Sequence, residues 1–267
     1  MIDGGVTAGE RLCNFVNHRL LKSDVWGTLE GLLDTTGRSA QLVLFFRELS
    51  AVTLTGRIVT AGQSLSVSFE TLDDPGFRKV YTEHLRDVAG IPTRLLDELF
   101  RHSLRAVAAA IDKTPPSVAK NMKAWAILRH PHCYICGTVL DFDAPELINS
   151  YTLEHIWPRA YGGDSVTENF LPACDSCNSK KKRHFATWVM PAVQSLQLGL
   201  SPGEQRLREI EGSYKFSLHY RAAQRVAMEK RITMKTAFLE IGPWTDVRLL
   251  DMDDVADFFN LENHAVR

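Results

Sequence analysis

The amino-acid sequence predicts an α+β fold that is mostly helical and contains a small cysteine-rich core. Apolar residues recur at helical spacing on both sides of a compact central segment. That segment carries two Cys-x-x-Cys pairs, Cys133 with Cys136 and Cys174 with Cys177. We therefore expect three regions: a mainly helical N-terminal region over residues 1–114, the core over 115–187, and a helical C-terminal region with an acidic tail over 188–267.

The composition narrows the class of protein. The chain is 45% hydrophobic, and 31 Lys+Arg against 32 Asp+Glu give a formal net charge of -1. No overall positive field attracts nucleic acid, so a site for a polyanion would have to be local. The first thirty residues lack the pattern of a secretory signal, and no apolar run approaches the roughly 20 residues of a membrane helix. We expect a soluble cytoplasmic protein without a membrane partner.

The N-terminal region is expected to be helical over residues 11–50 and 75–113, where apolar side chains follow helical spacing. Residues 52–72 contain β-branched and alternating apolar residues around Gly62, which predicts a short β-hairpin. The Pro115-Pro116 pair marks the start of the core, because proline disfavours helix before it and suits the first turn of a new helix.

The C-terminal region again has helical spacing, over residues 188–198, 204–211 and about 216–239. The last 27 residues carry six acidic side chains against two arginines. We do not expect this acidic end to contact phosphate.

The two cysteine pairs are separated by 37 intervening residues. Two such pairs place four thiolates tetrahedrally around one zinc ion, and disulfides are disfavoured in a reducing compartment. Four free thiols or a redox pair are the alternatives. Zinc held by four cysteines has no open coordination position, so the predicted ion stabilises the fold and takes no part in a reaction. Cys13 stands alone, and we interpret it as a small buried side chain.

The segment between and just after the cysteine pairs resembles the HNH endonuclease family, also called ββα-metal or His-Me finger nucleases. The matching elements are Glu154-His155-Ile156, Pro158, Gly162-Gly163, Glu168-Asn169-Phe170, Cys174-x-x-Cys177-Asn178 and Lys181. The resemblance covers roughly residues 133–184. It implies two strands followed by a helix, and hydrolysis of DNA to 5′-phosphate and 3′-hydroxyl ends.

The resemblance also implies a role for four residues. His155 would be the general base, since an imidazole with a usual pKa of about 6.5 accepts a proton from water near neutral pH. Glu154 and Asn178 would hold one Mg²⁺ or Mn²⁺ ion, because hard cations prefer oxygen ligands. Asn169 would brace the loop between the strands. Many family members have aspartate in place of Glu154, whose side chain reaches one methylene further.

A basic run follows Asn178 on the predicted helix, made of Lys180, Lys181, Lys182 and Arg183. Because the run adjoins the predicted metal site, we expect these side chains and Arg159 to contact phosphate. The expected partner is nucleic acid, in the first place DNA, and the flanking helical regions are candidates for contact with a protein. His130, His132 and His184 are interpreted as packing or surface residues.

The sequence thus predicts a metal-dependent HNH endonuclease with a structural zinc ion and a catalytic Mg²⁺ or Mn²⁺ ion. One alternative is a non-catalytic zinc module that binds nucleic acid or protein. Another is an RNase, since a histidine and a metal ion do not by themselves select the sugar. The regions that flank the HNH-like segment resemble no family that we recognise. Solitary HNH proteins with such flanking regions often act in bacterial defence against phage, and we expect the same role here.

Overall fold

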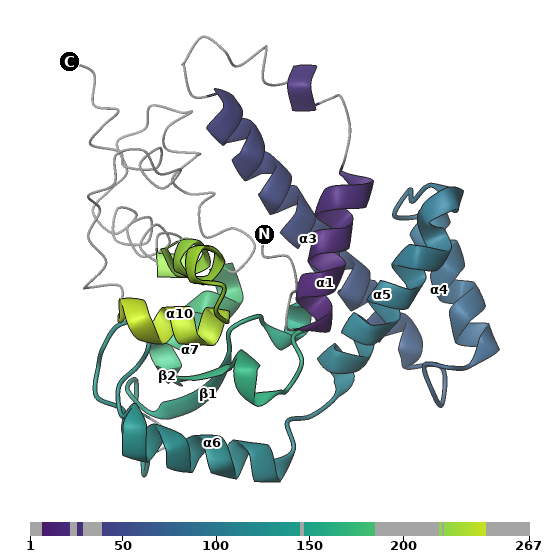
Figure 1. Cartoon of the computed structure of the whole chain (residues 1–267). Helices are drawn as coiled ribbons and strands as arrows, with labels where there is room; N and C mark the ends of the chain where they lie inside the picture. The colour runs from purple at the N-terminus through teal and green to yellow at the C-terminus, as the bar shows by residue number, and fades with distance from the viewer. Residues whose placement is uncertain are drawn as a thin grey trace, which may run out of the picture. The chain divides into compact units, whose positions relative to one another are not determined.

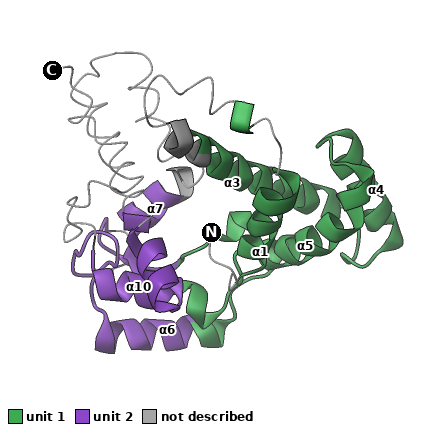
Figure 2. Cartoon of the chain, turned by 45° about the horizontal axis from the view of Figure 1, so that its top comes forward, with its two compact units in different colours: residues 1–118, 155–170 green, residues 119–154, 171–267 purple. Residues whose placement is uncertain are grey.

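A computed structural model describes residues 7–21, 26–28, 39–144, 147–184, 219–220 and 222–243, without the side chains of 39–42, 44–45 and 182–184. The described chain is mostly helical and contains one two-stranded sheet (Figure 1). The predicted α+β, mostly helical class is confirmed. The chain forms two compact units, the first made of residues 1–118 and 155–170, the second of residues 119–154 and 171–267 (Figure 2).

The first unit is built from helices. They are α1 (Ala8–Phe15), which continues into the π-helical turn η1 (Val16–Leu20), α3 (Ser39–Ser66), α4 (Pro75–Asp87) and α5 (Thr93–Ile111). Helix α1 begins with a capping box, in which the Thr7 hydroxyl accepts from the backbone of Glu10 and the Glu10 carboxylate accepts from the backbone of Thr7. Asp74 caps α4, whose first residue is proline.

The predicted β-hairpin over residues 52–72 is wrong, because α3 continues as helix to Ser66. The β-branched residues Ile58 and Val59 are buried side chains of this helix, at 2% and 0% exposure. Gly62, interpreted as a turn, lies where another helix approaches: a Cβ atom there would come within 2.4 Å of Val107 on α5. Burial against α5 outweighs the weak strand preference of these residues.

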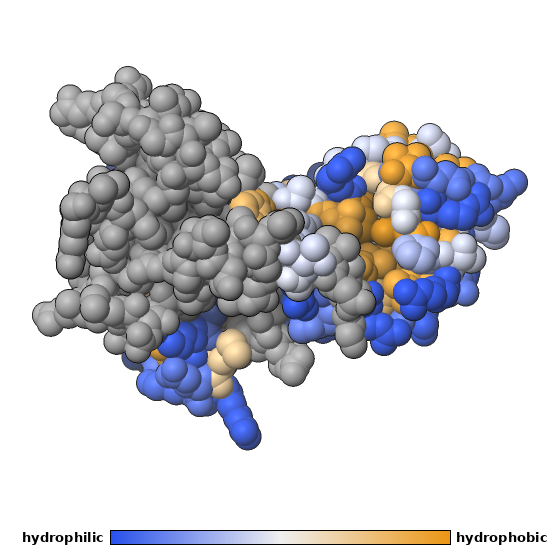
Figure 3. Space-filling model, turned by 90° about the horizontal axis from the view of Figure 1, so that it is seen from above, coloured by the Kyte–Doolittle hydropathy of each residue, from blue (hydrophilic) through white to orange (hydrophobic). Residues whose placement is uncertain are grey.

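Aromatic and aliphatic side chains fill the interior of this unit. Phe77 and Tyr81 stack with ring centroids 5.4 Å apart, and both are fully buried. The buried Tyr81 hydroxyl donates to the carbonyl of Ile58 at 3.0 Å, so α4 is joined to α3. On the one face that Figure 3 shows, apolar residues gather between hydrophilic ones.

The loop that follows His155 belongs to the helical unit. It contains the short 3-10 helices η3 (Arg159–Tyr161) and η4 (Thr167–Asn169). The backbone N–H of Gly9 on α1 donates to the carbonyl of Gly162 at 2.7 Å. Gly162 has a left-handed φ of +81°, and a Cβ atom there would come within 2.6 Å of Ala106 on α5. The N-terminal helices therefore support this loop directly, and only a glycine fits at Gly162.

The second unit contains most of the two-stranded sheet and the four paired cysteines. Its elements are most of α6 (Pro116–Arg129), most of β1 (Tyr151–His155) and β2 (Phe170–Cys174), α7 (Asp175–His184), a helix over 222–230 and α10 (Met234–Ile241). Strands β1 and β2 pair, and α7 follows β2 directly. This order of two strands and a helix is the ββα core that the sequence predicted. Within the described residues, none of the helices has the length and apolar character needed to cross a membrane.

Candidate active site and metal centre

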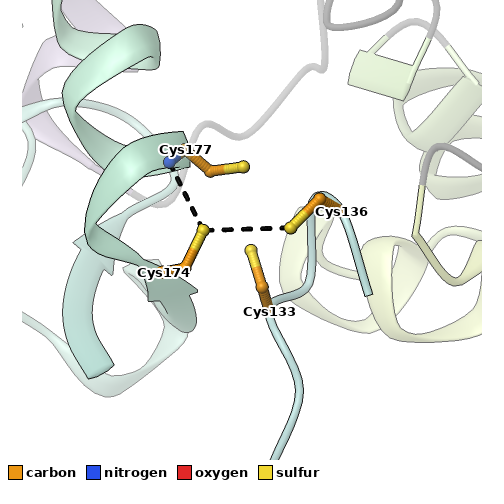
Figure 4. A group of neighbouring side chains, drawn as sticks. All are labelled: Cys133, Cys136, Cys174 and Cys177. Atoms are coloured by element: carbon orange, nitrogen blue, oxygen red, sulfur yellow. Dashed lines mark hydrogen bonds between the residues drawn. The ribbon is translucent and has the colours of Figure 1, made fainter. Parts of the chain in front are cut away.

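The four paired cysteines form one cluster in the second unit. Their sulfur atoms all lie within 4.8 Å of one another. Figure 4 shows the four side chains converging, two from the loop after α6, one from the end of β2 and one from α7. The backbone N–H of Cys177 donates to the Cys174 sulfur at 3.4 Å. Four converging sulfurs have the number and donor type of a structural zinc site.

The four thiols of the cluster differ in pKa, because each is affected by the neighbouring sulfur atoms. The pKa of Cys174 is lowered to about 7, first by the hydrogen bond from Cys133, and the same residue lowers the pKa of Cys136. The pKa values of Cys133 and Cys177 are raised by hydrogen bonds to the neighbouring sulfurs. Zinc binds thiolates, so the thiols of this cluster would lose their protons when the metal binds.

A buried polar triad lies beside the cysteines in the same unit. The ammonium group of Lys181 on α7 is 2.8 Å from one carboxylate oxygen of Glu154 on β1. The Tyr134 hydroxyl donates to the other carboxylate oxygen at 2.8 Å, and Lys181 donates to that hydroxyl at 3.2 Å. Burial raises the pKa of Tyr134 and lowers the pKa of Lys181, the latter effect being opposed by Glu154. The triad joins the first cysteine loop, β1 and α7.

The prediction that Lys181 contacts phosphate is wrong, because its side chain is 2% exposed and ion-paired with Glu154. Lys181 follows Cys177 by four residues, so both lie on the face of α7 that is buried. Lys180 on α7 and Arg159 on η3 are exposed, and their contact with nucleic acid stays a prediction. The side chains of Lys182 and Arg183 lie outside the described part of the chain.

Asn178 is also buried, at 8% exposure. Its amide nitrogen donates to the Thr152 hydroxyl at 3.0 Å, and Thr152 in turn donates to the carbonyl of Ala173. The bond to Thr152 fixes the amide group through its nitrogen, whereas a Mg²⁺ ligand would be the amide oxygen. The carboxylate of Glu154 and the amide of Asn178 thus have the donor types of a divalent-cation site, although Lys181 is the cation that Glu154 holds in this structure.

His155 ends β1 and is held by residues of the first unit. Its Nε2 atom lies 3.2 Å from the Ser165 hydroxyl, which is itself 3.1 Å from the Thr114 hydroxyl. The imidazole contacts the Phe170 ring edge-on, with the two ring centroids 4.5 Å apart. One ring nitrogen is therefore fixed by a hydroxyl group, and the ring plane is fixed by an aromatic neighbour.

Asn169 braces the loop between the two strands. Its amide oxygen accepts from the Trp157 backbone N–H at 2.8 Å, and its amide nitrogen donates to the carbonyls of Trp157 and Asp164, each at 3.0 Å. The side chain is 3% exposed, so these bonds are formed away from water. This is the bracing geometry that the resemblance implied for Asn169.

Sequence reasoning missed three residues that hold the predicted ones. Tyr134 lies inside the first Cys-x-x-Cys pair, Thr152 is two positions before Glu154, and Ser165 is in the loop. For Thr152 the alternation of a strand was an available signal, since residues two apart share a face. Tyr134 and Ser165 depend on contacts over 20 and 10 residues along the chain, which no local pattern reveals.

Comparison with known proteins identifies the segment that carries these residues. Residues 133–188 match the HNH endonuclease family. The match includes all four clustered cysteines, both strands and α7, and it confirms the resemblance seen in the sequence. The flanking regions lie outside it. Neither a curated protein nor a solved structure matches the chain.

Proposed function

We propose that the protein is a metal-dependent nuclease that hydrolyses phosphodiester bonds, with DNA as its substrate. The observation that supports this most is His155, which lies in the HNH-matching segment and has its Nε2 atom held by the Ser165 hydroxyl. A histidine that acts as a general base needs one nitrogen held and the other available for water. Ser165 supplies the first condition.

The proton transfer that we propose uses Nδ1 of His155. In this assignment the N–H group at Nε2 donates a hydrogen bond to the Ser165 hydroxyl oxygen, which fixes the tautomer with an unprotonated Nδ1 atom. Nδ1 removes a proton from water, and the resulting hydroxide attacks phosphorus. The bond between phosphorus and the 3′-oxygen then breaks, which leaves a 5′-phosphate, and the departing 3′-oxygen takes up a proton from solvent to become a hydroxyl. Ser165 keeps the ring in one orientation throughout, and the Phe170 ring limits its rotation.

Glu154 and Asn178 are the residues that we propose would hold the catalytic cation. When bound, Mg²⁺ or Mn²⁺ would stabilise negative charge on the phosphate and on the departing oxygen. In this structure Thr152 orients the Asn178 amide, and Lys181 and Tyr134 orient the Glu154 carboxylate. The cysteine cluster would keep β2 and α7 in register with the first cysteine loop.

The exposed cations Lys180 and Arg159 are proposed to contact the phosphate backbone. Charge on a flexible side chain binds phosphate without reading bases, so these contacts would give affinity and no sequence preference. The substrate would then be selected elsewhere on the protein.

The test is a cleavage assay with duplex DNA, single-stranded DNA and RNA, in Mg²⁺, in Mn²⁺ and in EDTA. The wild-type protein should cleave DNA in the presence of a divalent cation, and His155→Ala should lose cleavage while retaining its zinc and its circular dichroism spectrum. His84→Ala on α4 is the matched control and should remain active. Cleavage of RNA alone would assign an RNase. A folded, zinc-loaded wild type that binds these substrates without cutting any of them would instead indicate the non-catalytic zinc module.

A further inference from the structure

A cavity of about 340 Å³ opens in the second unit beside the first cysteine loop. This volume is at the lower end of the range of ligand pockets, about 300–1,000 Å³. Its walls come from the end of α6, the cysteine loop, β2 and α10. The residues that line it include Arg129, His130, His132, Tyr134, Phe238 and Pro243.

One wall of the cavity is basic. Arg129 ends α6, and His130 and His132 follow it. His130 packs on Trp125 at a centroid distance of 4.5 Å, and the Lys235 ammonium lies 4.5 Å from the centroid of the same Trp125 ring. This wall therefore contains a guanidinium group and two imidazoles, and the ammonium group of Lys235 lies near His130 on the Trp125 ring.

No carboxylate balances these charges among the residues that line the cavity. Residues 119–140 of the sequence contain no Asp or Glu, although the whole chain has slightly more acidic than basic residues. On α10, Glu240 forms an ion pair with Lys230 at 2.5 Å. The pKa of His130 is lowered, first by burial and then by Lys235 and Arg129, as expected in a positive environment. His130 is therefore neutral and can serve as a hydrogen-bond partner, while Arg129 and the nearby Lys235 supply the positive charge that suits this wall to an anion.

Other residues that line the cavity are apolar, and those on α10 are firmly packed. Phe238 on α10 is 2% exposed, and its ring contacts Tyr134 edge-on at 5.2 Å and His219 at 4.9 Å. The His219 Nε2 atom lies 2.8 Å from the carbonyl of Gly242, which fixes the end of α10. Leu239 and Pro243 also line the cavity. A ligand in the cavity would meet both a cation, Arg129, and hydrocarbon.

Tyr134 connects the cavity to the proposed metal ligand. It lines the cavity, and its hydroxyl donates to Glu154 at 2.8 Å. A group bound in the cavity would therefore be separated from Glu154 by a single side chain. This proximity favours an occupant that belongs to the same chemistry as the proposed nuclease.

We propose that this cavity is a nucleotide-binding subsite, which takes a phosphate against Arg129 and His130 and a base or sugar against Phe238 and Pro243. A nucleoside monophosphate unit has the required combination of an anionic group and a flat, weakly polar ring. The nucleotide that occupies the cavity is either part of a bound DNA strand or a free nucleotide with the same chemistry. The first of these occupants rests on the proposed function.

Two probes separate these sources: 2′-deoxyadenosine 5′-monophosphate, measured by isothermal titration calorimetry, and a labelled DNA oligonucleotide, measured by fluorescence anisotropy. Both use the zinc-loaded full chain carrying His155→Ala, so binding is measured without cleavage. Arg129→Gln removes the anion partner, and Leu239→Trp fills the cavity without changing its charge. Lys120→Gln is the matched control, because Lys120 is an exposed cation of α6 that does not line the cavity.

We expect Arg129→Gln and Leu239→Trp to weaken the binding of both probes at least 10-fold, while Lys120→Gln leaves monophosphate binding unchanged. Weaker binding of the monophosphate alone would assign the subsite to a free nucleotide. If the monophosphate does not bind, and neither cavity variant changes oligonucleotide affinity beyond the Lys120→Gln control, the subsite is refuted. That result leaves the cleavage assay unaffected, whereas absence of cleavage by the wild type with intact monophosphate binding would refute the nuclease and retain the subsite.

Discussion

The ammonium group of Lys181 lies 2.8 Å from the carboxylate of Glu154, and both side chains are almost completely buried, at 2% and 3% exposure. Because water does not reach either charge, each depends on the other for stabilisation. The pair links α7, which carries Cys177 and Asn178, to β1, which ends at His155. Lys181 therefore has a structural role that the surrounding basic run conceals in the sequence.

Removing Lys181 alone should destabilise the protein strongly. Lys181→Met leaves the Glu154 charge buried without its partner, so the free energy of unfolding should fall by about 3–5 kcal/mol. Combining Lys181→Met with Glu154→Leu removes both charges and should recover a large part of that loss. Urea denaturation of the zinc-loaded proteins measures both effects. Lys180→Met, on the exposed side of α7, is the control and should change stability by less than about 0.5 kcal/mol.

Equal stability of the single and double variants would contradict the pairing. It would mean that the Glu154 carboxylate does not require Lys181, and that the destabilisation of Lys181→Met comes only from lost packing.

The cysteine cluster should bind one zinc ion per chain and should be required for folding of the second unit. Cys136→Ser or Cys177→Ser should abolish stoichiometric zinc, measured by inductively coupled plasma mass spectrometry, and lower the melting temperature. Cys13→Ser is the control, because Cys13 is a buried cysteine of α1, outside the cluster, whose pKa burial raises to about 12. Wild-type protein purified without chelator and free of zinc would disprove the metal assignment.

The spacing of the cysteines was enough to predict their cluster, and the resemblance to the HNH family predicted the order of the core. A Cys-x-x-Cys pair fixes two ligands within one turn, so Cys133, Cys136, Cys174 and Cys177 reveal their cluster in the sequence. The bracing role of Asn169 could likewise be inferred from its place in a motif. In both cases a short motif carried the prediction, although the contacts of Cys136 with Cys174 and of Asn169 with Trp157 join residues 38 and 12 positions apart.

Contacts distant in sequence were not predictable in this way. Ile58 and Val59 suggested a strand, yet their burial in α3 depends on helices that follow tens of residues later. Lys181 was predicted to contact phosphate with the rest of its basic run, but the helix places it on the buried face of α7 that contains Cys177. Nor did the sequence indicate that α1 and α5 support the loop at Gly162, because that contact joins residues more than fifty positions apart.

Ser165 should act as a positioning residue for His155. Ser165→Ala removes the hydroxyl 3.2 Å from Nε2, so the ring loses its fixed orientation and kcat should fall roughly 10-fold to 100-fold with little change in KM. Ser165→Thr retains the hydroxyl and should restore much of the rate. The pH dependence of kcat is a second measurement. Without the Ser165 hydroxyl the proton is no longer fixed on Nε2 of His155, so the pKa of the general base that this dependence reports should change.

A purely structural role for Ser165 predicts a different pattern. Ser165→Ala would then lower the melting temperature while leaving the pH profile of the remaining activity unchanged. Thr114→Val provides a comparison, because Thr114 contacts Ser165 and not the imidazole and should have a smaller effect on kcat.

His219 should make the stability of the protein depend on pH. Burial lowers its pKa to about 4 from the ordinary value of 6.5, because the imidazole packs among Tyr134 and Phe238. The unfolded chain therefore binds a proton between these two pH values while the folded chain does not, so stability is greatest above pH 6.5 and falls as the pH drops toward 4. From the two pKa values, the loss of stability between pH 7 and pH 5 is about 2 kcal/mol.

The variant His219→Phe tests this pH dependence, because it retains an aromatic ring without a titrating group. Its free energy of unfolding should fall by about 2 kcal/mol less than that of the wild type between pH 7 and pH 5. Other titrating groups, including the zinc ligands, contribute equally to both proteins, so the difference between the two slopes isolates His219. Parallel pH dependences for the wild type and His219→Phe would show that His219 does not remain neutral in the folded protein.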